Sequence, residues 1–157
     1  MLDDDLIVPA ERIGPFKVGE LGEPQIALLN SVIQDEEERG GVKVITTKDV
    51  SLFIEHHILT QVGVHGSHPA RTNAGIRLHM KLGDLSENLH LDVYDEVLVM
   101  EGTVGLCFDV DVDLSPIATS VRESLDPVEL PREATIEWIG VFVADDVSDA
   151  TVPVKLV

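Results

Sequence analysis

The 157-residue chain has one cysteine, few basic residues and no long hydrophobic run. Because a single cysteine cannot form an internal disulfide, the fold must be held together by its hydrophobic core. No stretch of about 18 uninterrupted apolar residues is present, so a membrane-spanning helix is not expected. Residues 1–5 are acidic where a secretory signal would be basic. The sequence therefore predicts a protein that is made in the cytoplasm and stays soluble.

Basic residues are scarce relative to acidic ones. Eleven Lys and Arg stand against 29 Asp and Glu, which gives a net charge of −18, yet 44% of the residues are hydrophobic. Proteins that hold nucleic acid cluster Lys and Arg on one surface, so DNA is not expected as a bound ligand. Acids spread along the whole chain favour a halophilic source, because molar salt screens their mutual repulsion. An ordinary acidic protein is the alternative.

Apolar and polar side chains alternate along several short stretches, and this pattern predicts β-strands. The acidic run 35–38 reads as an exposed loop. The Gly- and Pro-rich segment 63–75 lies between two strand-like runs and predicts a long hairpin tip. The predicted strands are 42–46, 50–59, 76–82, 97–100, 104–113 and 135–144, with 152–157 as an edge strand containing Pro153.

One helix is predicted at residues 84–95. Asp84 and Glu87 have the spacing of a capping box, and Leu85 and Leu89 lie four residues apart. A short second helix could lie within 24–34. The predicted fold is mainly β (α+β): a single domain, 1–157, forming an antiparallel β-sandwich or barrel with one flanking α-helix, a long hairpin loop and an acidic N-terminal arm, 1–12.

The six histidines raise the possibility of a metal site. His65 and His68 have a spacing that could serve one ion, but no third ligand lies nearby in the sequence. A cupin-like enzyme would need a tighter histidine cluster on a strand. No metal ligand or cofactor is therefore predicted, and a metal-binding protein remains the weaker alternative.

An Asp-x-Asp-x-Asp run begins at Asp109 and resembles the start of a calcium loop. An EF-hand requires Gly at its sixth position and Glu at its twelfth, where this chain has Leu114 and Ser120. The run is therefore interpreted as an acidic strand face. No nucleophile elbow, phosphate-binding loop or dinucleotide fingerprint is present in the sequence. Cys107 is interpreted as a small buried hydrophobe, and no enzymatic activity is predicted.

The order and spacing of elements from Lys48 to Tyr94 resemble those of the major tail (tail tube) proteins of long-tailed viruses. The resemblance rests on segments 47–55, 60–63, 72–80 and 85–89. It implies a structural virion protein, assembled in the host cytoplasm into the viral tail. Such subunits form stacked homohexameric rings around a tape-measure protein, and DNA passes through the lumen without being bound.

The resemblance implies roles for two groups of residues, and a basic row suggests a third. The hairpin tip would be an inter-subunit loop that includes His65, Gly66, Ser67, His68, Arg71, Thr72 and Asn73. Acids that could line a lumen are Glu55, Asp109, Asp111 and Asp113. The basic row Arg77, His79 and Lys81 is a candidate interface strand face, with a solvated face as the alternative. The competing functions are a viral head decoration, turret or capsid protein, and the cupin-like metal-binding protein.

Overall fold

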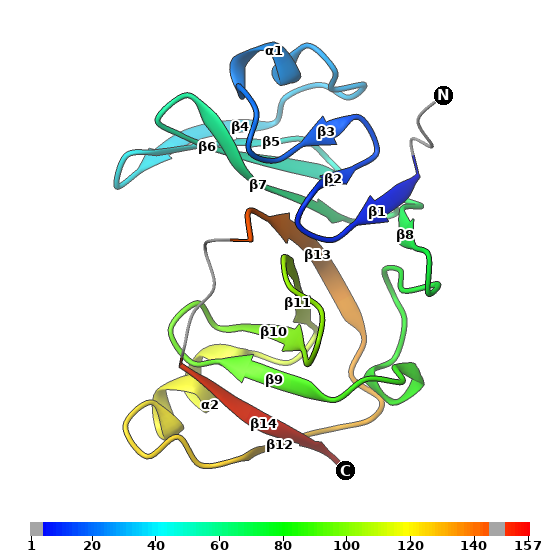
Figure 1. Cartoon of the computed structure of the whole chain (residues 1–157), viewed down its shortest axis with the longest axis vertical. Coiled ribbons are helices and arrows are strands. Elements are labelled where there is room, and N and C mark those ends of the chain that lie inside the picture. Colours follow the sequence, from blue (N-terminus) through cyan, green and yellow to red (C-terminus); the bar gives the residue numbers. More distant parts are fainter. Residues whose placement is uncertain (1–4, 145–149) are drawn as a thin grey trace.

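The computed structural model describes residues 5–144 and 150–157 of a mainly β protein (Figure 1). A small four-stranded sheet has the order β3-β2-β1-β8, and a large ten-stranded sheet has the order β12-β14-β9-β10-β11-β13-β7-β6-β5-β4. Most neighbouring strands are antiparallel, while the β1–β8 and β12–β14 pairs are parallel. The predicted mainly β fold with a flanking helix is confirmed.

The strands are short and follow the alternation of apolar residues. The small sheet contains β1 (Leu6–Val8), β2 (Arg12–Ile13), β3 (Phe16–Lys17) and β8 (Arg71–Thr72). The first part of the large sheet contains β4 (Asp35–Arg39), β5 (Val42–Thr46), β6 (Val50–Glu55) and β7 (Ile58–His65). Its remaining strands are β9 (Leu89–Asp92), β10 (Val97–Met100), β11 (Leu106–Val110), β12 (Val128–Leu130), β13 (Ile136–Phe142) and β14 (Thr151–Leu156).

Two short helices and one 3-10 turn complete the described structure. They are α1 (Glu23–Ile26), η1 (Leu82–Asp84) and α2 (Leu114–Val121). The large sheet extends through the whole molecule: β4 to β7 lie in the upper part of Figure 1, β9, β10, β12 and β14 lie in the lower part, and β13 crosses between them. The small sheet packs against the upper part, beside β7.

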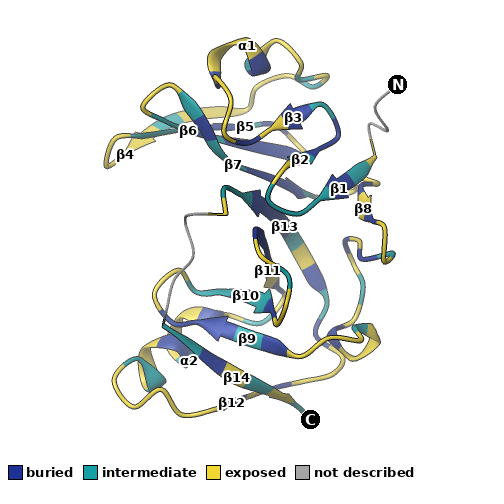
Figure 2. Cartoon of the chain, viewed as in Figure 1, coloured by how far each residue is buried: buried dark blue, intermediate teal, exposed yellow. Residues whose placement is uncertain are grey.

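The core lies on one face of the large sheet, as the period of two requires. Leu52 and Ile54 of β6, Val62 and Val64 of β7 and Phe108 of β11 are all at most 5% exposed. Figure 2 shows this burial along the centres of the strands, while loops and α1 are largely exposed. The other face of the same strands is only partly covered, and it forms the groove described below.

The predicted hairpin between 50–59 and 76–82 is wrong. The chain turns much earlier, at His56 and His57, whose φ angles of 50° and 67° suit a tight two-residue turn. Strand β7 then runs back along β6 and continues to His65, so the first three residues of the proposed tip belong to a strand. The sequence pattern predicts strand at both histidines, because a positive φ leaves no mark in the order of apolar and polar residues.

The predicted strand 76–82 is replaced by an irregular segment that makes only isolated bridges. Its alternation of burial is nevertheless real, since Ile76, Leu78 and Leu82 are buried and the residues between them are not. His79 interrupts the extended backbone with a φ of 68°. The sequence pattern at residues 76–82 therefore indicates which side chains are buried, but it does not indicate the backbone conformation.

The predicted helix 84–95 is also wrong, because this region contains η1 followed by strand β9. Leu89, Leu91 and Val93 are at most 3% exposed, which is an alternation of period two that competes with the period-four spacing. The Asp84 side chain caps nothing, and Glu87 accepts a hydrogen bond from Thr103 Oγ1 at 3.0 Å. Pairing of β9 with both β10 and β14 decides the outcome.

The flanking helix lies instead at α2, directly after the predicted strand 104–113. Asp113 is its N-cap, and its side chain accepts a hydrogen bond from Ser115 N at 3.1 Å. Pro116 lies in the first turn, where a missing N–H costs nothing. This Asp-Leu-Ser-Pro start was the available signal for a helix.

Three further boundaries differ from the prediction. The acidic run read as a loop is strand β4, an edge strand paired with β5. Strand β14 is not an edge, because β12 pairs with it in parallel from Val154 onward. Residues 5–12 of the proposed N-terminal arm form β1 and the start of β2, whereas residues 1–4 lie outside the described residues.

Candidate functional site

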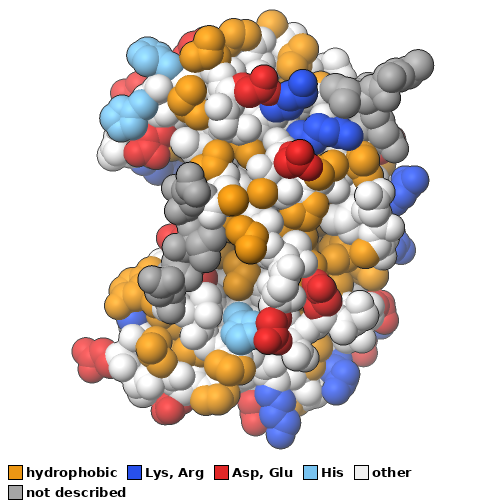
Figure 3. Space-filling model, viewed as in Figure 1, with side chains coloured by type: hydrophobic (Ala, Val, Ile, Leu, Met, Phe, Trp, Pro, Cys, Tyr) orange, Lys and Arg blue, Asp and Glu red, His pale blue; other side chains and the backbone are white. Residues whose placement is uncertain are grey.

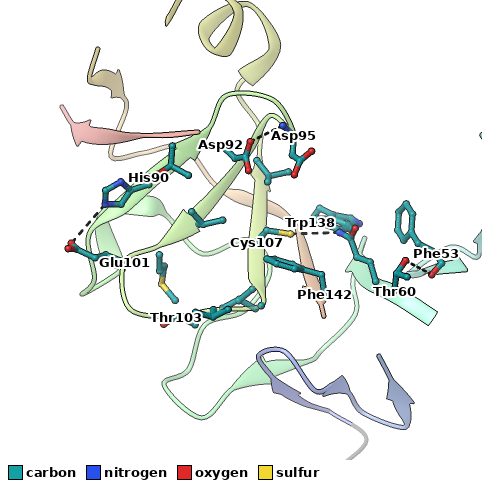
Figure 4. A pocket seen from close by; sticks show the side chains of 18 of the residues that line it. Phe53, Thr60, His90, Asp92, Asp95, Glu101, Thr103, Cys107, Trp138 and Phe142 are labelled. Carbon is teal, nitrogen blue, oxygen red and sulfur yellow. Dashed lines mark hydrogen bonds and ion pairs between the residues drawn. The ribbon is translucent and has the colours of Figure 1, made fainter. Parts of the chain in front are cut away.

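The partly covered face of the large sheet forms a groove with a volume of about 740 Å³ (Figure 4). Its floor is built from residues that alternate with core residues along β6, β13, β11 and β10. Phe53 alternates with Leu52 and Ile54, and Cys107 alternates with Leu106 and Phe108. We define the groove by its apolar floor and its polar rim. The floor comprises Phe53, Val97, Val99, Cys107, Trp138 and Phe142.

Trp138 occupies the centre of this floor because two glycines make room for it. Gly63 of β7 lies directly opposite Gly140 of β13. A Cβ atom on either glycine would come within 2.2 Å of the indole ring, so the ring lies over both backbones. Phe53 contacts the indole edge to face, with ring centroids 6.4 Å apart and an interplanar angle of 87°. The two strands thus present a flat aromatic surface to the groove.

Cys107 contributes no reactivity to the groove. The residue is 3% exposed, and burial raises the pKa of its thiol to about 12. Gln61 lies close enough for its Nε2 to donate to Cys107 Sγ at 3.8 Å. A thiol that stays protonated is neither a nucleophile nor a metal ligand at neutral pH, so the prediction of a small buried hydrophobe fits this environment.

The rim of the groove is acidic. Glu55, Asp92 and Glu101 are among its lining residues. Figure 4 shows Glu101 beside His90 and Asp92 beside Asp95. Asp92 is held in place, because its Oδ1 accepts hydrogen bonds from Tyr94 N at 3.0 Å and Asp95 N at 2.9 Å. None of the described residues that line the groove is a lysine or arginine.

The residues of the predicted inter-subunit loop do not form one exposed loop, because several of them lie in strands. His65 ends β7, with its Nε2 3.0 Å from Ser51 Oγ, and His68 Nδ1 accepts a hydrogen bond from Ala70 N. Burial lowers the pKa of both imidazoles, against the opposing effect of the Asp49 carboxylate. The remainder of the proposed loop is therefore Gly66, Ser67 and Asn73, with Arg71 and Thr72 forming β8.

The predicted basic strand face Arg77, His79 and Lys81 is not a continuous row in the structure. Arg77 lies opposite Arg71 in an isolated bridge. His79 Nε2 lies 2.7 Å from Gly66 O, and Lys81 Nζ forms an ion pair with Glu133 at 2.7 Å. Lys81 therefore has an acidic partner within its own chain, which does not support the predicted role of this row as an interface face.

The four candidate lumen acids lie in two places. Glu55 is on the groove rim, whereas Asp109, Asp111 and Asp113 surround a separate depression of about 410 Å³. Asp111 Oδ1 accepts a hydrogen bond from Thr135 N at 2.9 Å, and Asp113 caps α2. Burial raises the pKa of Asp109. The predicted ladder on one strand face is therefore wrong, because the strand ends at Val110.

The arrangement of histidines and acids offers no cluster for an ion. Among residues 5–144 and 150–157, no three His, Cys, Asp or Glu side chains are placed to hold a metal. His65 and His68 hydrogen bond to Ser51 and to the backbone of Ala70, as described above.

Sequence reasoning missed the groove as a site. The signal was present at residues 50–59, where both faces of the predicted strand contain apolar side chains and Phe53 is on the second face. The relation between Trp138 and the two glycines could not be seen, because Gly63 and Trp138 are 75 positions apart in the chain.

None of the helices in the described part of the chain is long and apolar enough to cross a membrane. Comparisons of this chain with protein-family models, with curated proteins and with solved structures find no match.

Proposed function

We propose that this protein is a structural subunit that assembles with copies of itself, and that the assembly is the tail tube of a virus. The observation that supports self-assembly is the groove, an aromatic and apolar surface whose floor residues, apart from the buried Cys107, are only half-buried in the described part of the chain. Monomeric proteins rarely leave contiguous apolar surface uncovered, and such surfaces generally mark interaction sites.

Two other features favour an assembling subunit. The large sheet ends in two strands, β4 and β12, whose outer edges pair with no strand in the described structure. Open edges allow sheets to continue from one molecule to another. Four of the five residues of β4 are acidic, so pairing along this edge would be weak until salt or a basic partner reduces the repulsion.

The tail-tube form of the proposal depends on the resemblance to tail tube proteins described above. The long hairpin tip and helix 84–95, on which the resemblance depended, are absent from the described structure, so the mainly β fold and the acidic composition are its remaining support. In this form, homohexameric rings stack around a tape-measure protein within the virion. An acidic lumen would repel DNA phosphates and let the genome pass without binding. A halophilic virus would explain the net charge of −18.

Negative-stain electron microscopy of the purified protein, in parallel at 0.1 M and at molar salt, tests the proposal. Rings of six or tubes are the expected result. Trimers or pentamers would favour a head decoration, turret or capsid protein instead. A monomer at every salt concentration and protein concentration would refute self-assembly.

A second candidate function is the binding of a small apolar molecule. The groove volume falls within the range of about 300–1,000 Å³ typical of ligand pockets, and its floor is aromatic with polar groups at the rim. Thermal denaturation in the presence of a panel of hydrophobic compounds would reveal such binding as a rise in Tm. A compound that stabilises a monomer without inducing assembly would favour this second function.

A further inference from the structure

The described chain exposes a second apolar surface, outside the groove, on the connection between α1 and β4. We call residues 27–34, Ala-Leu-Leu-Asn-Ser-Val-Ile-Gln, the apolar loop. Leu28 is 43% exposed, Val32 85% and Ile33 41%, while Leu29 packs against the core and anchors the loop. Figure 3 shows hydrophobic side chains gathered in this region, over α1. A cluster of exposed aliphatic side chains of this kind generally marks an interaction site.

The apolar loop does not reach the groove of its own chain. Gln34 N donates to Thr46 O, so the loop joins the sheet beside β5. The helix that precedes the loop lies on the core face of the sheet, because Gly22 contacts the side chain of the core residue Ile54. The groove lies on the other face, where Phe53 and Trp138 line it. Any contact between loop and groove must therefore join two molecules.

The two surfaces match in polarity. The apolar loop has eight consecutive residues without a charge in a chain of net charge −18, and the groove floor is likewise uncharged. When the apolar loop lies on the groove floor, no two acidic side chains meet at the centre of the contact. The polar residues of the loop, Asn30, Ser31 and Gln34, have N–H or O–H donors that suit the carboxylates of the rim.

We infer that the apolar loop of one copy inserts into the groove of a second copy, with Val32 and Ile33 against the aromatic floor. This inference rests on the proposed self-assembly and names its contact. Because loop and groove are different surfaces, the contact is head to tail, and repeating it closes a ring or extends a filament. An apolar contact also persists in concentrated salt, where attraction between charges is screened beyond about 3 Å.

Disulfide trapping tests the contact directly. Val104 is 54% exposed at the mouth of the groove, so Val32→Cys protein is mixed with Val104→Cys protein that has a different mass. The native Cys107 is buried, with a thiol pKa raised to about 12, and it contributes little background. We expect a cross-linked heterodimer under mild oxidation. Thr119→Cys, on the exposed side of α2, replaces Val32→Cys in the matched control and should give no more than collisional background.

A charge substitution tests the same contact without cross-linking. Val32→Asp should raise the protein concentration needed for assembly by about 10- to 100-fold, because a carboxylate would enter an apolar site. Val157→Asp makes the same change at another exposed valine and should have much less effect. Circular dichroism and Tm verify that both variants remain folded, as expected for exposed positions.

The outcomes separate this inference from the proposed function. If the wild-type protein assembles, but Val32→Asp assembles equally well or Val32→Cys cross-links only to itself, the loop-to-groove contact is wrong and self-assembly stands. If the wild-type protein forms no assembly at any salt concentration, the proposed function fails and takes the inference with it.

Discussion

Single residues determine the shape of the groove floor, and Gly63 is the clearest example. Its missing side chain lets the Trp138 indole lie across β7, and an added methyl group would overlap the ring. Because the indole is also packed against Phe53, it cannot move away without losing that contact. The groove thus depends on a residue that contributes no atoms of its own to the lining.

The substitution Gly63→Ala should therefore destabilise the protein by about 1–3 kcal/mol, the usual cost of overpacking. Urea denaturation of the wild type and the variant measures the difference. In a Trp138→Ala background the same substitution should cost little, since the overlapping ring is gone. Equal costs in both backgrounds would show that the indole does not lie over Gly63.

His65 and His68 make stability depend on pH. Burial lowers the pKa of both imidazoles below the ordinary value of 6.5, so the folded state binds fewer protons than the unfolded state. Stability is then fully present above pH 6.5 and falls as pH decreases through about 6.5. The double variant His65→Gln and His68→Gln should lose less stability than the wild type between pH 7 and pH 5.5. Chemical denaturation at several pH values measures this, and parallel curves would contradict it.

At the scale of elements, α2 shows how one side chain fixes where a strand ends and a helix begins. Asp113 accepts a hydrogen bond from Ser115 N, so the helix starts directly after the irregular residues 111–112. Loss of an N-cap costs about 1 kcal/mol. Asp113→Ala should lower the free energy of unfolding by that amount. Asp126→Ala removes the same charge from an exposed connection after α2 and serves as the control; an equal loss there would point to a general charge effect.

The β6–β7 turn offers a gain in stability. His56 and His57 both have positive φ angles, a backbone conformation that Asn and Gly adopt more easily. The double variant His56→Asn and His57→Gly should raise the free energy of unfolding by about 0.5–1 kcal/mol. The variant with Ala at both positions should be less stable than the wild type. A stabilising Ala variant would contradict the turn geometry.

At the scale of the whole molecule, the net charge of −18 governs the response to salt. The Debye length falls from about 10 Å at 0.1 M to about 3 Å at 1 M, so repulsion among dispersed acids weakens. The urea midpoint should rise when NaCl increases from 0.1 M to 1 M. A midpoint that is unchanged or lower would argue against self-repulsion and remove the main reason to infer a halophilic source.

Local patterns allowed prediction of the class of fold and of many buried residues. Alternation of apolar side chains correctly predicted the strands around 42–46, 97–100 and 136–142 and the burial of Ile76 and Leu78. The prediction of backbone conformation failed where the sequence fits both the helical and the strand period, as at Leu89. It also failed where a tight turn contains no glycine, as at His56. In both cases contacts with distant strands decided the outcome, and a single sequence does not display those contacts.

The sequence by itself determined the charge, the single isolated thiol and the mainly β character, because these follow from composition and from side-chain alternation. Only the tertiary structure decided that Gly63, Gly140 and Trp138 meet on neighbouring strands and that Phe53 joins them in one groove. The physical reason is that strand order and register bring together residues far apart in the chain. The groove, and with it the proposed contact between copies, exists only once those strands are paired.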